Sequence, residues 1–86
     1  MKLNTDRLNT FYQVALDKNF CKAAETFWIT QSGLSQRVLK LEQEIGTHLF
    51  IRSPDGVAMT HQGRVLFDYV SNLQAREQDV LNEVPV

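Results

Sequence analysis

Apolar residues recur with a helical period in the middle of the chain. Leu34, Val38, Leu41 and Ile45 stand at i, i+4, i+7 and i+11, the spacing of one buried helix face. Thr30 precedes this stripe and is a good N-cap, because its hydroxyl can accept a hydrogen bond from a first-turn N–H group. The stretch Ile29 to Ile45 therefore predicts one capped helix, with residues 31–45 helical.

The opposite face of this helix is polar and concentrates its side chains in the N-terminal half. Gln36 suits bidentate pairing to adenine, Arg37 suits guanine, and Ser35 can serve either base. Lys40 is better placed to bind phosphate, as a point charge on a flexible stem. The polar set is Gln31, Ser32, Ser35, Gln36, Arg37 and Lys40. This face predicts a reader of the major groove, whereas a solvated surface helix is the alternative that the stretch alone leaves open.

Two shorter helices are predicted ahead of it. The first covers about Thr5 to Asp17, with an apolar face of Leu8, Phe11, Val14 and Ala15. Lys18 and Asn19 break the period and supply a turn and a possible cap. Residues 21–28 then predict a short second helix. Trp28 could stack on another group, but we expect it to be partly buried where it seals the turn into the third helix. Two helices joined by so short a turn predict a helix-turn-helix.

A strand–turn–strand pattern follows the third helix. Gly46 is the expected left-handed residue that ends the helix. Residues 48–52, 53–56 and 57–60 predict a strand, a turn and a second strand, with Pro54 and Gly56 at the second and fourth turn positions. A two-stranded hairpin after a helix-turn-helix is a wing. The fold class predicted is mostly α, a winged helix-turn-helix with a three-helix core and a two-stranded wing over residues 1–60.

The last segment, residues 61–86, predicts one long linker helix. Thr60 caps it, and a helix over about residues 61–82 would measure roughly 33 Å. Its apolar stripe consists of Leu66, Val70, Leu73 and Val80. A domain of this size could cover that stripe only in part, so we interpret it as a dimerisation surface. The alternative is that the helix folds back on its own domain.

The low net charge of the chain means that any cations that contact DNA must be grouped locally. The 86 residues carry a net charge of −1. Residues 1–60 hold seven Lys and Arg against six Asp and Glu (+1), and residues 61–86 hold two against four (−2). Charge in bulk therefore argues against a strong non-specific binder of nucleic acid. It leaves open a winged helix that serves protein–protein interaction instead.

The sequence shows no pattern typical of a disulfide, a metal site or a catalytic site. Cys21 is the single cysteine, so no internal disulfide is possible and a reducing compartment fits. His48 and His61 belong to no cluster with metal-ligand spacing, and no acid–base pair stands out. The chain shows no signal-peptide core and no membrane-spanning apolar run. We therefore expect a cytoplasmic protein that is not an enzyme and needs no metal or cofactor.

Taken together, the motifs resemble the N-terminal DNA-binding domain of LysR-type transcriptional regulators over about residues 5–75. The resemblance rests on Leu8, Phe11, Phe20-Cys-Lys-Ala-Ala24, Thr30-Gln-Ser-Gly-Leu-Ser-Gln36, Leu41-Glu42, Ile45-Gly46, Leu49-Phe50, Arg52 and Thr60-His-Gln-Gly63. It implies a bacterial transcription factor that binds partly symmetric, AT-rich promoter sites as a homodimer through its linker helix.

The resemblance also implies roles for single residues. Thr30, Gln31, Ser32, Ser35 and Gln36 would lie at the base-reading front of the recognition helix. Arg52, in the wing, would reach the minor groove or the phosphates beside it. The sequence departs from the family pattern at Ser32, where Pro is usual, at Gln36, where Arg is common, at Asp55 in the wing tip, and at Cys21, where Ser or Thr is preferred. These departures leave the operator sequence open.

Family members continue into an effector-binding domain of two α/β lobes. Nothing in these residues encodes that domain, so we expect a truncated chain, with a naturally short protein as the alternative. A small-molecule effector would act only through the domain absent here.

Overall fold

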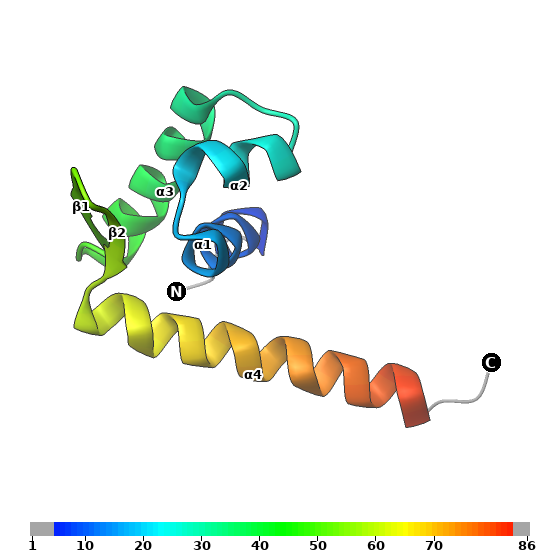
Figure 1. The fold of residues 1–86 in the computed structure, drawn as a ribbon. Helices are drawn as coiled ribbons and strands as arrows, with labels where there is room; N and C mark the ends of the chain where they lie inside the picture. Colours follow the sequence, from blue (N-terminus) through cyan, green and yellow to red (C-terminus); the bar gives the residue numbers. More distant parts are fainter. Residues whose placement is uncertain (1–4, 84–86) are drawn as a thin grey trace.

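The computed structural model describes the backbone of residues 5–83 and the side chains of residues 5–76. Its elements are α1 (Thr5–Asp17), α2 (Phe20–Thr26), α3 (Gln31–Ile45), β1 (Phe50–Ser53), β2 (Gly56–Met59) and α4 (His61–Glu83). Figure 1 shows α1, α2 and α3 gathered on one side of α4, with the hairpin beside the start of α4. This arrangement confirms the predicted winged helix-turn-helix followed by a long helix.

The core forms where the apolar faces of the first three helices meet the base of the wing. Phe11, at the centre of α1, is fully buried. The centroid of its ring lies 5.2 Å from that of the Phe50 ring, and the centroid of the Phe20 ring lies 5.8 Å from that of Phe50. The remaining buried apolar residues are Val14, Ala15, Ala23, Ala24, Leu34, Val38, Leu41 and Leu49. Aromatic contacts therefore tie β1 to α1 and α2, so the wing starts from a fixed position.

The predicted caps of α2 and α3 are confirmed. The Lys22 amide donates to Oδ1 of Asn19 at 3.0 Å, and the Gly33 amide donates to Oγ1 of Thr30 at 3.0 Å. Gly46 ends α3 with a φ of 86°, the left-handed conformation that glycine adopts without a steric penalty. The third helix thus begins and ends where the sequence predicts.

The prediction for Trp28 is wrong. Its side chain is 92% exposed, and its φ is 58°. The helix α2 ends at Thr26, and the Ile29 and Trp28 amides donate to the carbonyls of Ala24 and Glu25 at 3.1 and 3.2 Å. These two bonds form a Schellman motif, in which the left-handed residue just past the helix is directed outward. The half-buried place in the turn is occupied by Ile29 instead.

The wing is a short antiparallel hairpin. Phe50 pairs with Met59 and Ser53 pairs with Gly56, so Pro54 and Asp55 form the turn as predicted. The first strand begins two residues later than predicted. The reason is that the Leu49 amide donates a hydrogen bond to Oε2 of Glu42 at 2.7 Å, so this amide does not pair with the second strand.

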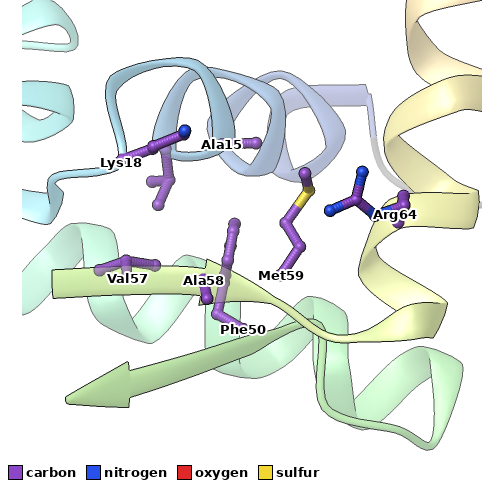
Figure 2. Close-up of a pocket in the computed structure, with 8 residues that line it drawn as sticks. Ala15, Lys18, Phe50, Val57, Ala58, Met59 and Arg64 are labelled. Carbon is purple, nitrogen blue, oxygen red and sulfur yellow. The ribbon is translucent and has the colours of Figure 1, made fainter.

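A hollow of about 290 Å³ lies between α1 and the wing (Figure 2). Figure 2 shows Met59 of β2 and Arg64 of α4 directed into it, with Lys18 at the end of α1 on the other side. The wing therefore meets α1 through a few side chains, chiefly Phe50 and Met59, and not across a closely packed sheet face.

The start of α4 is attached to the wing by hydrogen bonds and by a close backbone contact. Oγ1 of Thr60 donates to the His48 carbonyl at 2.7 Å and accepts from the Gly63 amide at 3.0 Å. A Cβ on Gly63 would lie 2.1 Å from the carbonyl oxygen of Leu49. Only glycine lets the two backbones approach this closely.

The apolar stripe of α4 divides into a covered part and an exposed part. Val70 is only 4% exposed, which corrects the expectation that it lies on an uncovered surface. Leu66 packs against the core, and the neighbouring Phe67 ring stacks on Tyr12 of α1 at 5.1 Å. Leu73 is 43% exposed. The predicted contact residue Val80 lies outside the described side chains.

Within residues 5–83, no helix is both long and apolar enough to cross a membrane.

Candidate nucleic-acid interface

The polar face of α3 is open to solvent. Figure 1 shows the start of α3 on the side of the molecule away from α4. The exposed members of the polar face are the predicted contact residues Thr30, Gln31, Ser32, Gln36 and Lys40. Opposite them, Leu34, Val38 and Leu41 are buried and anchor the helix to α1 and α2. Because its inner face is held, α3 presents amide, hydroxyl and ammonium groups in a fixed array.

Arg37 lies on a flank of α3 and is half-buried. One residue beyond Gln36 corresponds to a rotation of about 100° around the helix axis. Glu44, two turns further on the same flank, forms an ion pair with Arg7 of α1. Arg37 therefore extends from the side of α3 that faces α1, and only the end of its long side chain can reach past the edge of the helix.

Arg52 of the wing is held against α3. Its Nη2 donates to Oγ of Ser35 at 3.0 Å, and its guanidinium carbon lies 3.6 Å from the centroid of the Phe20 ring. The second contact is a cation–π interaction with a ring that is itself buried. Arg52 pairs with Val57, one ladder pair from the turn, and these contacts fold its side chain back against α3.

A groove of about 330 Å³ runs between α3 and the wing. Its polar rim consists of Ser35, Gln36, His48 and Arg52, and Leu39 adds an exposed apolar side chain. Glu42 also lines the groove, but its carboxylate accepts hydrogen bonds from the Leu49 and Phe50 amides. The groove therefore offers both hydrogen-bond donors and acceptors, with one apolar contact of the kind that fits a thymine methyl group.

Cys21 links the starts of α2 and α3. Its Sγ donates to Oε1 of Gln31 at 3.0 Å, so the thiol takes the place of the hydroxyl donor that Ser or Thr would provide. Gln31 keeps its side-chain amide NH₂ group for another acceptor. The sequence had indicated no partner for this cysteine.

Two supporting residues were not predicted from the sequence. Phe20 was included only as part of a motif, and its contact with Arg52 joins positions 32 apart in the chain. Glu42, assigned no role, fixes the end of α3 to the start of the wing. Both contacts join residues that are not neighbours in the sequence, so only paired substitutions at the two positions among related sequences could have indicated them. Among the described side chains, no three His, Cys, Asp or Glu residues are grouped to hold a metal ion.

Comparisons with known proteins agree with this geometry. Residues 5–64 match the family described as "Bacterial regulatory helix-turn-helix protein, lysR family". The HTH-type transcriptional regulator HdfR of Escherichia coli is 34% identical over 82 residues, which are 95% of this chain and 29% of the relative. The chain thus spans less than a third of the length of that relative.

Solved structures show the same fold. The crystal structure of the BenM DNA-binding domain with catB site 1 DNA has a TM-score of 0.82 and 28% identity, covering 93% of this chain and 90% of that one. ArgP from Mycobacterium tuberculosis has a TM-score of 0.85 and 29% identity, covering 95% of this chain and 31% of that one. The chain belongs to the LysR family of bacterial regulatory helix-turn-helix proteins.

Proposed function

We propose that this chain binds specific sequences of double-stranded DNA, as the promoter-recognition part of a LysR-type transcription regulator in the bacterial cytoplasm. The observation that carries the proposal is the exposed polar face of α3 beside a fixed Arg52. The related BenM domain has been crystallised with DNA in a structure with the same fold. Residues 1–60 would contact DNA, and residues 61–86 would link two subunits. Its function would be binding, without chemistry on the DNA.

The base readers in this proposal are Gln31, Ser32, Ser35 and Gln36. They occupy the first half of α3, the part that enters the major groove in helix-turn-helix proteins. Ser35 would hold Arg52 while its hydroxyl remains able to accept or donate at a base edge. Lys40, Arg52 and the capped start of α3 at Thr30 would contact phosphates and so position the helix.

Arg37 is assigned to phosphate in this proposal, in place of the guanine contact expected from the sequence. Its half-buried stem on the α1 flank of α3 supports this assignment, since a side chain there reaches the edge of the groove before its floor. A phosphate contact would act equally on all sequences, whereas a bidentate guanine contact would be specific.

The proposal includes a homodimer formed through α4. Exposed apolar side chains at Val65, Tyr69 and Leu73 lie along its uncovered side. The half-buried Leu66 lies beside them and also lines an apolar groove with Ile45 and Leu49. A two-fold dimer would place two recognition helices in successive major grooves, roughly 34 Å apart.

Titration of fluorescein-labelled duplexes, followed by anisotropy at several salt concentrations, tests the proposal. Each phosphate contact releases counterions, so log K should fall linearly with log salt, by a slope of about 0.9 per contact. Gln36→Ala should weaken binding to the preferred duplex by about 1–3 kcal/mol and reduce discrimination between sequences. Arg37→Ala should weaken binding to all duplexes equally and lower the salt slope by about one.

Gln43→Ala is the matched control, because Gln43 is an exposed glutamine on the same helix, two turns beyond Gln36. It should bind as the wild type does. Binding that ignores salt would contradict the proposal and favour a protein-interaction module instead.

A further inference from the structure

Trp28 is the most exposed large apolar side chain among the described residues. Its indole is 92% exposed, and among residues 5–76 it forms no hydrogen bond or ring contact. We propose that Trp28 contacts the DNA backbone beside the major groove, with the indole packed on a deoxyribose and its Nε1–H donating to a phosphate oxygen. The inference rests on the proposed function.

The free domain gains no stability from tryptophan at this position. Trp28 is the left-handed residue of the Schellman motif that ends α2, with a φ of 58°. Glycine or asparagine occupies such positions with little strain, whereas a bulky side chain is disfavoured there. Because its indole stays exposed in the folded domain, Trp28 also gains almost none of the free energy that burial of an aromatic side chain provides. A residue that is both strained and exposed is better explained by a contact made outside the free domain.

The position of Trp28 identifies DNA as that partner. It stands two residues before Thr30, the N-cap of α3, and Thr30, Gln31 and Ser32 are all exposed after it. Figure 1 shows the α2–α3 connection on the side of the molecule opposite α4, where the recognition helix begins. The exposed surface of Trp28 is therefore continuous with the surface proposed to face DNA.

The chemistry of indole fits the backbone at the edge of the groove. The major groove is about 12 Å wide and is filled by a helix, so residues flanking the helix start meet the phosphate strands. Tryptophan offers an apolar face and a single N–H donor, which match a deoxyribose ring and the phosphate oxygen next to it. Such a contact carries no sequence information. Because indole is neutral, the contact would add affinity without releasing counterions.

Trp28 is the only tryptophan in the chain, so its fluorescence reports on this contact directly. We would titrate the 86-residue protein with duplexes of about 30 base pairs that it enriches from a random library, long enough for a dimer to span two half-sites. Complex formation should shift the emission and reduce quenching of Trp28 by acrylamide. Trp28→Asn should lower affinity about tenfold, equivalent to about 1.4 kcal/mol, on every duplex and leave the salt slope unchanged.

The same Trp28→Asn variant should melt at a higher temperature than the wild type, because asparagine tolerates the left-handed conformation. A loss of affinity with a gain of stability separates a contact to DNA from a structural role. Leu16→Ala is the matched control: Leu16 is 52% exposed on α1, which packs between α2 and α4, and its removal should not change DNA affinity.

Two results would overturn the inference. If anisotropy shows the complex while acrylamide still reaches Trp28 and Trp28→Asn binds equally well, Trp28 does not touch DNA, and the proposed function stands. If no duplex forms a complex with the folded protein, the proposed function fails and this inference fails with it.

Discussion

At the scale of single residues, Gly63 and Glu42 hold the wing between the two long helices. Gly63 lets the backbone of α4 approach the Leu49 carbonyl, and the Glu42 carboxylate accepts a hydrogen bond from the Leu49 amide. The backbone of Leu49 is thereby bound on both sides, and its side chain is buried. These two contacts therefore help to fix the wing relative to α3 and α4.

Gly63→Ala should destabilise the domain by about 1–3 kcal/mol, because the new Cβ would overlap the Leu49 carbonyl and force the backbones apart. For a domain of this size, each kcal/mol lowers the melting temperature by about 4–8 °C. Thermal unfolding followed by circular dichroism measures the change. Gln62→Ala, at the exposed neighbouring position, should melt as the wild type does, and an equally stable Gly63→Ala variant would contradict the close contact.

Glu42→Ala should cost about 1–3 kcal/mol of unfolding free energy, since it leaves the buried Leu49 amide without an acceptor. Glu42→Gln retains a carbonyl oxygen at the same place and should lose less. Urea denaturation of the two variants distinguishes the cases. Equal losses would show that the negative charge of Glu42 matters more than the hydrogen bond.

Predictions for single residues were correct where the contact joins neighbours in the sequence, and they failed where the outcome depends on backbone hydrogen bonds or on residues far away in the chain. The caps at Thr30 and Thr60 depend on neighbours within three residues, so the residue types suffice. Trp28 was expected to be covered because aromatic residues usually are, but the Schellman motif that turns it outward is set by backbone hydrogen bonds. The contact of Arg52 with Phe20 depends on how the wing meets α2, which no local pattern encodes.

At the scale of elements, α3 and α4 differ in how much of their apolar face the chain covers. The stripe of α3 is buried apart from the half-buried Ile45, and its period together with Thr30 and Gly46 predicted both ends of the helix. The stripe of α4 is covered at Val70 and open at Leu73, because only the first half of α4 packs beside α1. Amphipathic spacing showed that α4 is a helix but could not show which residues its own domain covers.

Leu73→Glu should convert the proposed dimer into monomers, because a charge would be buried in the apolar contact. Sedimentation velocity measures the change, and affinity for a two-half-site duplex should fall with it. Asn72→Glu is the matched control, since it adds the same charge at the adjacent exposed position. An unchanged sedimentation coefficient for Leu73→Glu would remove this part of α4 from the interface.

At the scale of the whole molecule, affinity and specificity would come from different parts of the domain. The net charge is −1, so attraction to DNA must come from a few placed cations and not from the protein as a whole. The wing, the flank of α3 and Trp28 would position the domain, while the first half of α3 would read the bases. Pairing through α4 would let two copies of α3 contact the same DNA site. A domain with few cations could then still bind a specific sequence.

Selection of bound duplexes from a random library at physiological salt shows whether the domain reads a specific DNA sequence as a dimer. The wild type and a Gln36→Ala, Arg37→Ala double variant would be compared in parallel. We expect the wild type to enrich a two-fold-symmetric site with half-sites about one helical turn, or a multiple of it, apart, and the double variant to lose or relax it. A folded wild type that enriches no sequence, or a double variant that enriches the same site equally, would contradict sequence-specific binding by a dimer.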